Sequence, residues 1–198
     1  MVIGKTIQGV RNCLREVKIL VVNDGSSDDT GIEAKKAGAE IIERPTRLAG
    51  DNVPTLPVLI HSVQQMEKNG YKPDLIVLLY ATAPLVKASH IEEGIKKNSE
   101  GYDSVISVCE DTRNYKLWKI EGRSYKPLFK GRVNRQKAEK LYRENGAFYI
   151  MTYDTLMKKK SITGKRTALT IMKTEESVDI DTPLDFLIAE ALINMKED

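Results

Sequence analysis

Two spacings of apolar residues alternate along this 198-residue chain, one typical of helices and the other of strands. Each helical segment except the last is followed by a short apolar run, which is typical of a buried strand. The run at 74–80 (DLIVLLY) predicts the central strand of the sheet. We expect helices at about 3–14, 28–38, 55–69, 89–98, 154–160 and 183–195, and strands at 19–22, 39–43, 74–80, 104–109, 147–151, 168–172 and 178–180.

Residues that favour helix ends support several of these boundaries. Ser26 or Ser27 is a suitable N-cap for the second helix, and Gly38 is a typical stop. Ser89 and Glu92 have the spacing of a capping box, and Thr182 precedes Pro183 at the start of the last helix. The last helix is expected to bury one apolar face, made of Leu184, Leu187, Ile188, Ala191, Leu192 and Met195.

Strands that alternate with helices predict a single α/β domain over residues 1–198, a three-layer α/β/α sandwich with a mostly parallel sheet. Residues 110–141 interrupt the alternation. Within them, 118–121 and 125–129 read as short strands that turn at Gly122, so we expect a small antiparallel excursion there.

Composition excludes several classes of protein. The net charge of +3 suits anionic small molecules and gives no sign of a nucleic-acid partner. Two cysteines, Cys13 and Cys109, are too few for a disulfide framework and indicate a reduced, cytoplasmic protein. With His61 and His90 as the only histidines, a histidine-rich metal site is excluded, and no apolar run is long enough for a membrane span.

Polar residues follow several predicted strands, at the carboxyl ends where α/β sheets bind ligands. Asp179 and Asp181 alternate along a predicted strand, so both carboxylates are expected on one side, as suits Mg²⁺. The alternative is that Asp181 only starts the helix and Asp179 is solvated. Thr82 lies in the loop after the central strand, where a plain connection is the alternative.

A third polar group comes just before the strand at 147–151. Arg143 and Asn145 precede Gly146, which permits a close backbone approach, and a guanidinium binds a carboxylate or phosphate through two hydrogen bonds. Arg135 and Gln136 lie close upstream in the sequence. The alternative is a turn that carries a surface arginine.

Taken together, these motifs resemble the acylneuraminate cytidylyltransferases, the CMP-sugar synthetases, from Ala39 to the C-terminus. The segments that carry the resemblance are ERPTRLAGD, DLIVLLYATAPLVKASHI, DSVISV, YRENGAFYI and SVDIDTPLDF. The resemblance implies a nucleotide-diphospho-sugar transferase fold and Mg²⁺-dependent transfer of CMP from CTP to the anomeric hydroxyl of an acidic keto sugar, releasing pyrophosphate. It also implies a homodimer, with residues 110–141 as the dimerisation insert.

The resemblance further implies roles for individual residues. Asp181 and Arg143 would be catalytic, and Asp179 with Asp181 would hold Mg²⁺. The sugar would be met by Tyr80, Thr82, Arg135, Gln136, Arg143, Asn145 and Gly146, and the nucleotide by Asp24, Arg44 and Asp51.

Some parts of the chain depart from that family. Tyr80 stands where the family usually has glutamine, and Val86 where an arginine is common, which points to a different choice of sugar. The family's opening strand and its glycine-rich basic loop for the CTP phosphates find no match here. The first forty residues, with Asn23-Asp24-Gly25, resemble family 2 glycosyltransferases instead. A glycosyltransferase and a catalytically impaired nucleotide-binding homologue are therefore the alternative hypotheses.

Overall fold

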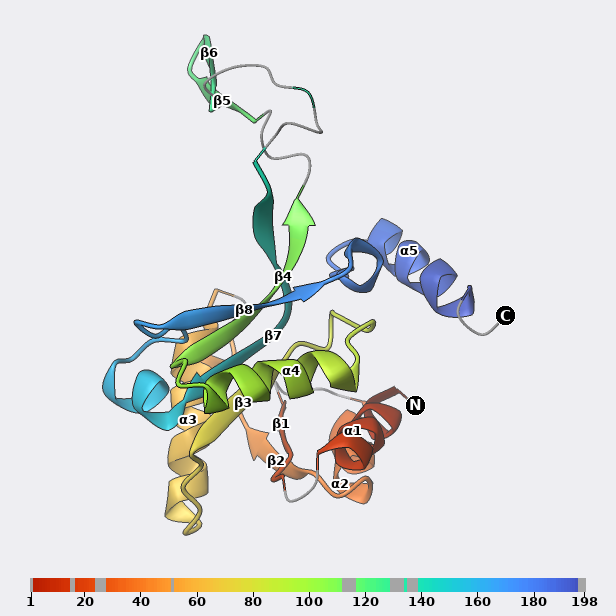
Figure 1. Ribbon diagram of the computed structural model, residues 1–198. Coiled ribbons are helices and arrows are strands. Elements are labelled where there is room, and N and C mark those ends of the chain that lie inside the picture. Colours follow the sequence, from red (N-terminus) through yellow and green to blue (C-terminus); the bar gives the residue numbers. More distant parts are fainter. Residues whose placement is uncertain are drawn as a thin grey trace. The chain divides into compact units, whose positions relative to one another are not determined.

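The computed structural model describes residues 2–14, 17–23, 28–50, 52–111, 117–128, 134 and 139–195 (Figure 1). The chain divides into two compact units. The first contains Met1–Val77, Ile95–Ser104 and Ile150–Thr167; the second contains Leu78–Gly94, Val105–Tyr149 and Ala168–Asp198. Each is described by itself, and the expectation of a single domain stays a prediction.

The first unit opens on the helix and the strand that the apolar pattern predicted. Its elements are α1 (Val2–Cys13), β1 (Leu20–Asn23), α2 (Thr30–Lys36), β2 (Glu40–Glu43), the 3₁₀ turn η1 (Thr46–Leu48) and α3 (Thr55–Lys68). β1 and β2 pair in parallel, with Leu20 opposite Glu40. Ile7, Ala34 and Ala39 are buried together and join α1, α2 and the start of β2 in one small core.

Gly38 ends α2 as predicted, and its conformation explains why a glycine stands there. Its φ is +88°, a left-handed value that L-residues rarely adopt. The Nη2 of Arg11 lies 2.9 Å from the position that a β-carbon would take, and it donates a hydrogen bond of 2.6 Å to the Gly38 carbonyl. A side chain at position 38 would therefore displace the link between α1 and α2.

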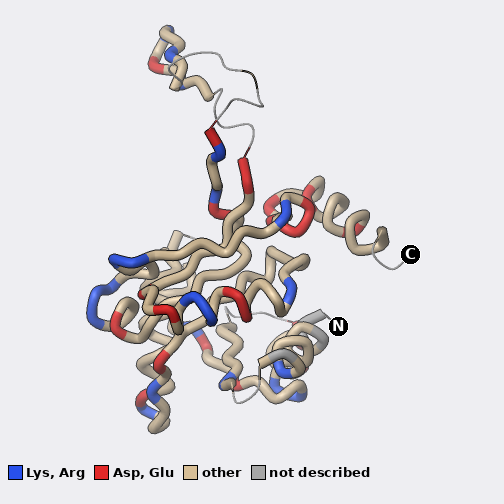
Figure 2. Tube along the Cα trace, viewed as in Figure 1, with Lys and Arg blue, Asp and Glu red and all other residues tan. Residues whose placement is uncertain are grey.

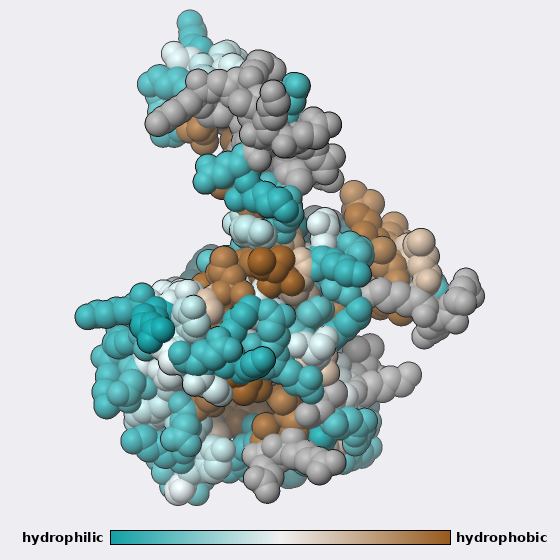
Figure 3. Space-filling view, in the orientation of Figure 1, coloured by the Kyte–Doolittle hydropathy of each residue, from teal (hydrophilic) through white to brown (hydrophobic). Residues whose placement is uncertain are grey.

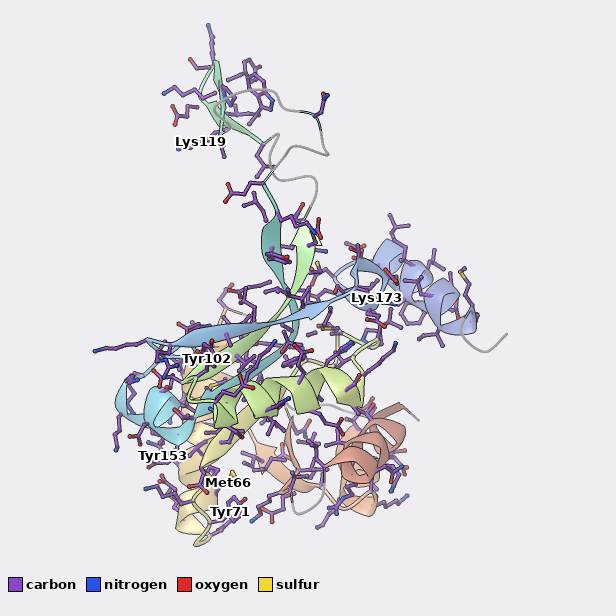
Figure 4. All side chains as sticks on the ribbon, viewed as in Figure 1. Met66, Tyr71, Tyr102, Lys119, Tyr153 and Lys173 are labelled. Carbon is purple, nitrogen blue, oxygen red and sulfur yellow. The ribbon has the colours of Figure 1, made fainter. Side chains whose placement is uncertain are left out.

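The first unit also contains η4 (Asp154–Lys158), a π-helical turn where the sequence predicted a short helix. The residue before it, Tyr153, is labelled in Figure 4 and donates a 2.6 Å hydrogen bond from its hydroxyl to Glu67 of α3. Lys72 lies 4.4 Å from the centre of the same ring. These two contacts fix η4 against the end of α3.

A four-stranded sheet contributes residues to both units, in the order β3 (Leu75–Leu79), β7 (Leu141–Thr152), β4 (Ser104–Asp111) and β8 (Thr167–Met172). β7 runs antiparallel to β3, since Tyr153 bonds to Asp74 while Tyr80 bonds to Ala147. It also runs antiparallel to β4, because the partner of residue 103 is Thr152 whereas that of Ser107 is Phe148. The α/β class is confirmed, with a mixed sheet.

The position of β3 differs from the expectation. β3 is the end strand of the four-stranded sheet, and its residues are half-buried or exposed instead of fully buried. β1 and β2 form a sheet of their own, so among the described strands only β7 pairs with β3. An apolar run predicts a strand but does not say how many neighbours that strand has.

The sequence predicted the start of one of the two remaining α-helices correctly and that of the other wrongly. α4 (Ala88–Ser99) starts before Ser89, so the predicted capping box is wrong; the ring of His90 instead accepts a hydrogen bond of 3.2 Å from the backbone N–H of Lys87. α5 (Pro183–Asn194) begins as predicted. Thr182 accepts a bond from the Asp185 backbone, while the Asp185 carboxylate accepts one from the Thr182 backbone.

The expected burial of α5 is wrong. Its apolar surface is exposed, with 64% of Leu184, 59% of Leu187 and 75% of Met195 accessible, and within the helix only Ala189 is buried. Figure 2 shows the helix almost free of charged positions, and Figure 3 shows it as a largely hydrophobic surface. Apolar residues lie on several sides of α5, so the spacing that predicted one buried face does not distinguish that face from the others. None of the described helices is long and apolar enough to cross a membrane.

The excursion contains the predicted hairpin. β5 (Trp118–Glu121) and β6 (Ser124–Pro127) pair antiparallel and turn at Gly122, whose φ is +61°. Lys119, labelled in Figure 4, and Lys126 both form ion pairs with Glu121. These charged side chains alternate along the strands with apolar ones, so the hairpin is amphipathic.

Candidate functional site

Three segments far apart in the sequence meet in the second unit. They are the loop that follows β3, the middle of β7, and residues 173–182, which run from the end of β8 to the start of α5. The backbone N–H of Ile180 donates a 2.9 Å bond to the carbonyl of Thr82. Asn145 of β7 donates a 2.8 Å bond to Ser177. These three segments carry the predicted site residues Tyr80, Thr82, Asn145, Gly146, Asp179 and Asp181.

The closest approach in this region is between Gly146 and Asp179. Gly146 has a φ of +67°, and a β-carbon there would stand 2.8 Å from the Oδ2 of Asp179. Gly146 is thus required for two reasons, its left-handed backbone and the space that the carboxylate occupies. The sequence suggested that Gly146 permits another group to approach the backbone closely. In the structure that group is the Asp179 side chain of the same protein.

Asp179 and Asp181 differ in their surroundings. The Oδ1 of Asp179 is buried and has no hydrogen-bond partner, whereas Asp181 is exposed. The predicted strand at 178–180 is wrong, since those residues belong to no strand. Strand alternation therefore does not place both carboxylates on one side.

The carboxylates of Asp179 and Asp181 are donors of the kind that a divalent cation binds. A buried carboxylate oxygen without a partner is costly unless a ligand satisfies it. Asp179 and Asp181 offer two hard oxygen donors, and the described residues contain no group of three or more metal-ligating side chains. Mg²⁺ matches such a set, because it keeps several waters and binds substrate phosphates.

An aromatic pair joins the end of β3 to β7. The rings of Tyr80 and Tyr149 meet edge to face, with centroids 6.1 Å apart and planes at 77°. The hydroxyl of Tyr149 donates a 2.9 Å bond to Glu144. Burial, the Glu144 carboxylate and, further down in size, the charge of Asp179 raise the pKa of Tyr149, so this hydroxyl stays protonated.

A buried charged cluster connects the loop after β3 to the Asp179 segment. Glu176, which is 5% exposed, forms an ion pair with Lys87 and lies 3.3 Å from the Nε2 of His90. The hydrogen bond from Lys87 holds the pKa of Glu176 below its usual value. Burial lowers the pKa of His90, and its Nδ1 accepts a backbone N–H, so neutral His90 donates from Nε2 to Glu176.

Asn145 acts within the protein as a brace. Its side chain is 2% exposed and bonds to Ser177, to the Met172 sulfur at 3.3 Å and to the backbone of Ala147. Ser177 in turn donates a 2.7 Å bond to the carbonyl of Lys173, labelled in Figure 4. These contacts fix the turn η5 (Thr174–Glu176) just before Asp179. The substrate-binding role expected for Asn145 stays a prediction.

Two of the three predicted arginines are described by the structure, and they lie in different units. Arg143 belongs to the second unit and has its Nε 3.7 Å from the Oδ2 of Asp111, with a side chain that is half exposed. Arg44 belongs to the first unit and donates to the carbonyl of Leu48. It also lines a groove of about 390 Å³ along β2 and α3, together with His61 and Gln65. The catalytic and nucleotide-binding roles expected of these two residues stay predictions.

Four predicted residues, Asp24, Asp51, Arg135 and Gln136, lie outside the described residues. Sequence reasoning missed Glu176, Lys87 and Tyr149 as parts of the site. Tyr149 stands only three residues after Gly146, so its place on the same strand was a usable signal. Lys87 and Glu176 are 89 residues apart, and no local sequence pattern predicts their contact.

Comparison with known proteins identifies relatives over most of the chain. A CMP-N,N'-diacetyllegionaminic acid synthase of Campylobacter jejuni is 32% identical, over 89% of this chain and 77% of that protein. The post-translational flagellin modification protein B of Campylobacter coli is 29% identical, over 90% and 78%. An N-acylneuraminate cytidylyltransferase of Streptococcus agalactiae is 30% identical, over 76% of this chain and 37% of that protein. No family model matches the chain.

Solved structures share the fold at low sequence identity. A CMP:2-keto-3-deoxy-manno-octonic acid synthetase complexed with CTP superimposes with a TM-score of 0.62 at 12% identity, over 96% of this chain and 88% of that one. A 4-diphosphocytidyl-2C-methyl-D-erythritol synthase of Anaerococcus prevotii gives a TM-score of 0.66 at 14% identity, over 98% and 86%. With the sequence relatives, these likenesses place the chain: it belongs to the acylneuraminate cytidylyltransferase family, the CMP-sugar synthetases.

Proposed function

We propose that this protein transfers CMP from CTP to the anomeric hydroxyl of an acidic keto sugar and releases pyrophosphate, with Mg²⁺ as cofactor. The observation that carries the proposal is the buried, unpartnered Oδ1 of Asp179, which is held against Gly146 beside the loop after β3. The names of the relatives, a CMP-legionaminic acid synthase and N-acylneuraminate cytidylyltransferases, agree with this chemistry.

The reaction is an in-line displacement. The anomeric oxygen of the sugar forms a bond to the α-phosphorus of CTP, the bond from that phosphorus to the oxygen shared with the β-phosphate breaks, and the hydroxyl proton goes to solvent base. Positioning and neutralisation of charge account for most of the catalysis in phosphoryl-type transfers. When bound, Mg²⁺ supplies neutralisation of the triphosphate and of the departing pyrophosphate.

The chain's own residues prepare that site. Asp179 and Asp181 would hold the cation, and the Asn145 brace and the Glu176 cluster fix the segment that carries them. Arg143, half exposed beside Asp111, offers a guanidinium to the carboxylate of the sugar. Asp111, whose side chain is only 10% exposed, lies beside Arg143 and restrains its position.

The experiment that tests the proposal measures pyrophosphate release from CTP, UTP, GTP and ATP, each with Mg²⁺ and a panel of eight- and nine-carbon acidic keto sugars. The expected result is release with CTP only, dependent on both the sugar and the cation. Turnover of GDP-mannose or UDP-glucose with no use of CTP would refute the proposal in favour of a glycosyltransferase. Binding of CTP without turnover of any sugar would indicate the impaired homologue.

We further propose that the protein works as a homodimer, with the β5–β6 hairpin as part of the interface. Cross-strand neighbours share a face, so Trp118, Ile120, Tyr125 and Pro127 lie together on one side of the hairpin. Trp118, Ile120 and Tyr125 are 51%, 69% and 70% exposed. A two-stranded hairpin is marginal in water, and a contiguous apolar face of this kind marks an interaction surface.

The oligomeric state tests the second proposal. Ile120→Glu should convert a dimer into a monomer in sedimentation experiments, because it places a charge on the apolar face. Arg123→Glu, in the turn of the same hairpin, is the matched control and should leave the dimer intact. A monomeric wild-type protein, or a dimer that tolerates Ile120→Glu, would contradict the role of this face.

A further inference from the structure

One side of α5 is an apolar stripe that stays exposed in the single chain. The stripe consists of Leu184, Leu187, Ile188, Ala191 and Met195, which recur at the spacing of one helical face. Its four large side chains are between 42% and 75% exposed. An apolar surface of this kind, visible on α5 in Figure 3, marks a site where another surface docks.

The second unit also carries a surface that can cover this stripe. It is the hairpin face, made of Trp118, Ile120, Tyr125 and Pro127 on one side of β5 and β6. A two-stranded ribbon with an apolar side packs naturally on the apolar side of a helix. Both surfaces are exposed within the same chain, so a contact between them requires a second copy.

The charges around the two surfaces are complementary. Residues 117–128 contain three basic residues and one acidic residue, which gives the hairpin a net charge of +2. Residues 182–195 contain two acidic residues, Asp185 and Glu190, and no basic residue, which gives a net charge of −2. Opposite charges favour the contact between hairpin and helix and disfavour the contact of either surface with its own copy.

The area of the two surfaces is sufficient for a stable dimer. With exposed fractions as large as these, one contact between the hairpin face and the stripe would bury on the order of 800 Å². In a two-fold symmetric dimer each contact occurs twice, so the total would be about 1,600 Å², the size of a typical stable interface.

The stripe is directly connected to the candidate cation site. The carboxylate of Asp185, in the first turn of α5, accepts hydrogen bonds from the backbone N–H groups of Asp181 and Thr182, at 3.3 and 2.8 Å. Ala189 is the one residue of α5 that is buried, so the chain's own packing restrains this helix weakly. A partner that packs on α5 therefore also restrains Asp181.

From these observations we propose that the hairpin face of one copy docks on the α5 stripe of a second copy, reciprocally, and that this contact fixes Asp181 for cation binding. The contact assigns the partner surface for the proposed homodimer. Its effect on Asp181 rests on the proposed function, whereas the contact itself does not.

The test mixes two variants that each damage a different surface. Ile120→Glu alters the hairpin face and Leu187→Glu alters the stripe, so each variant alone loses both contacts of the symmetric dimer. Each should dimerise at least about 100-fold more weakly than the wild type in sedimentation experiments. An equimolar mixture should form a dimer again, because the hairpin face of the Leu187→Glu chain and the stripe of the Ile120→Glu chain are both intact.

A control and several outcomes make this test decisive for the contact. Ile32→Glu, which charges an equally exposed apolar residue of α2, should leave the dimer intact. If either variant alone dimerises as the wild type does, or if the mixture stays monomeric, the contact is refuted. A monomeric wild type also refutes it, including one whose α5 binds lipid vesicles instead.

Pyrophosphate release from CTP tests the effect on Asp181 separately. Each variant alone should need at least threefold more Mg²⁺ for half-maximal activity than the wild type, and the mixture should recover part of the difference. An equal Mg²⁺ requirement in monomer and dimer refutes the effect on Asp181. No release with any of the proteins refutes the proposed function, and the sedimentation result still decides the contact.

Discussion

Gly146 and Asp179 are placed so closely that a single added carbon would separate them. A β-carbon at position 146 would stand 2.8 Å from the Oδ2 of Asp179, and the Oδ1 of the same carboxylate is buried without a hydrogen-bond partner. The glycine thus admits a carboxylate that the folded protein itself does not fully satisfy. A functional site is where such an unsatisfied group is expected.

Gly146→Ala should damage activity far more than a strained backbone alone would. The left-handed φ costs about 1–2 kcal/mol for any L-residue, and here the new methyl group also displaces Asp179. Gly70→Ala is the matched control, because Gly70 has a φ of +79° and nothing within 4 Å of the added carbon. Denaturation and CTP turnover should show a similar loss of stability from backbone strain in both variants, but loss of turnover only at position 146. Equal activity in the two variants would contradict the contact.

Asp179→Asn should separate stability from activity. It removes the charge of a carboxylate whose Oδ1 is buried without a hydrogen-bond partner, so in metal-free buffer the free energy of unfolding should stay the same or rise. CMP-sugar formation should fall on the order of 100-fold or more, since a charge at the reacting phosphate is lost. Asp154→Asn, an exposed carboxylate on η4, should leave both properties unchanged.

Asp181→Asn tests the second carboxylate. This residue is exposed, so its substitution should leave the free energy of unfolding nearly unchanged while it raises the Mg²⁺ concentration needed for half-maximal activity. Full activity at the Mg²⁺ concentration that saturates the wild type would refute its role as a cation ligand.

Glu176→Gln should loosen the segment that carries both aspartates. The buried carboxylate accepts from Lys87 and His90, and its loss should lower the free energy of unfolding by about 1–3 kcal/mol. A larger Mg²⁺ requirement should accompany this loss, because Asp179 follows three residues later. Glu175→Gln, at the exposed neighbouring position, serves as the control. If the two variants are equally stable, the cluster does not support the site.

The pH dependence of unfolding follows from His90. Burial lowers its pKa below the usual value of 6.5, so the unfolded chain binds a proton more readily than the folded one. Stability is therefore fully present above about pH 6.5 and falls as the pH drops below it, by at most about 1.4 kcal/mol per unit. Chemical denaturation between pH 8 and pH 5.5 measures this slope. In His90→Gln the decline over that range should be smaller, and an identical slope would show that another group causes it.

The sequence predicts local structure well wherever a residue acts on its neighbours. Thr182 and Pro183 identified the start of α5, Gly38 the end of α2, and the turn at Gly122 the hairpin. In each case the cause is confined to a few adjacent residues, through a cap bond or a left-handed φ. Parts of the candidate site were indicated in the same way. Gly146 is a residue type that permits a close approach, and Asp179 is one that supplies a hard oxygen donor.

The features that failed depend on distant parts of the chain. Ser89 has the spacing of a capping box, but the ring of His90, which also contacts the distant Glu176, accepts the Lys87 backbone N–H, and the helix starts earlier. Residues 178–180 were predicted as a strand, yet they belong to none, and the N–H of Ile180 donates to the distant Thr82 carbonyl. The burial of β3 and α5 depends on which elements cover them, and an apolar pattern does not contain that information.

The central claim is that Asp179 belongs to a site that joins CMP to an acidic sugar. Phosphorus NMR of CTP, Mg²⁺ and an acetamido-bearing acidic keto sugar measures it most directly, with wild-type protein and with Asp179→Asn side by side. The account predicts equal amounts of pyrophosphate and of a CMP phosphodiester with the wild type, and almost none with the variant. Equal product from both proteins, or consumption of a nucleotide sugar without any use of CTP, would contradict it.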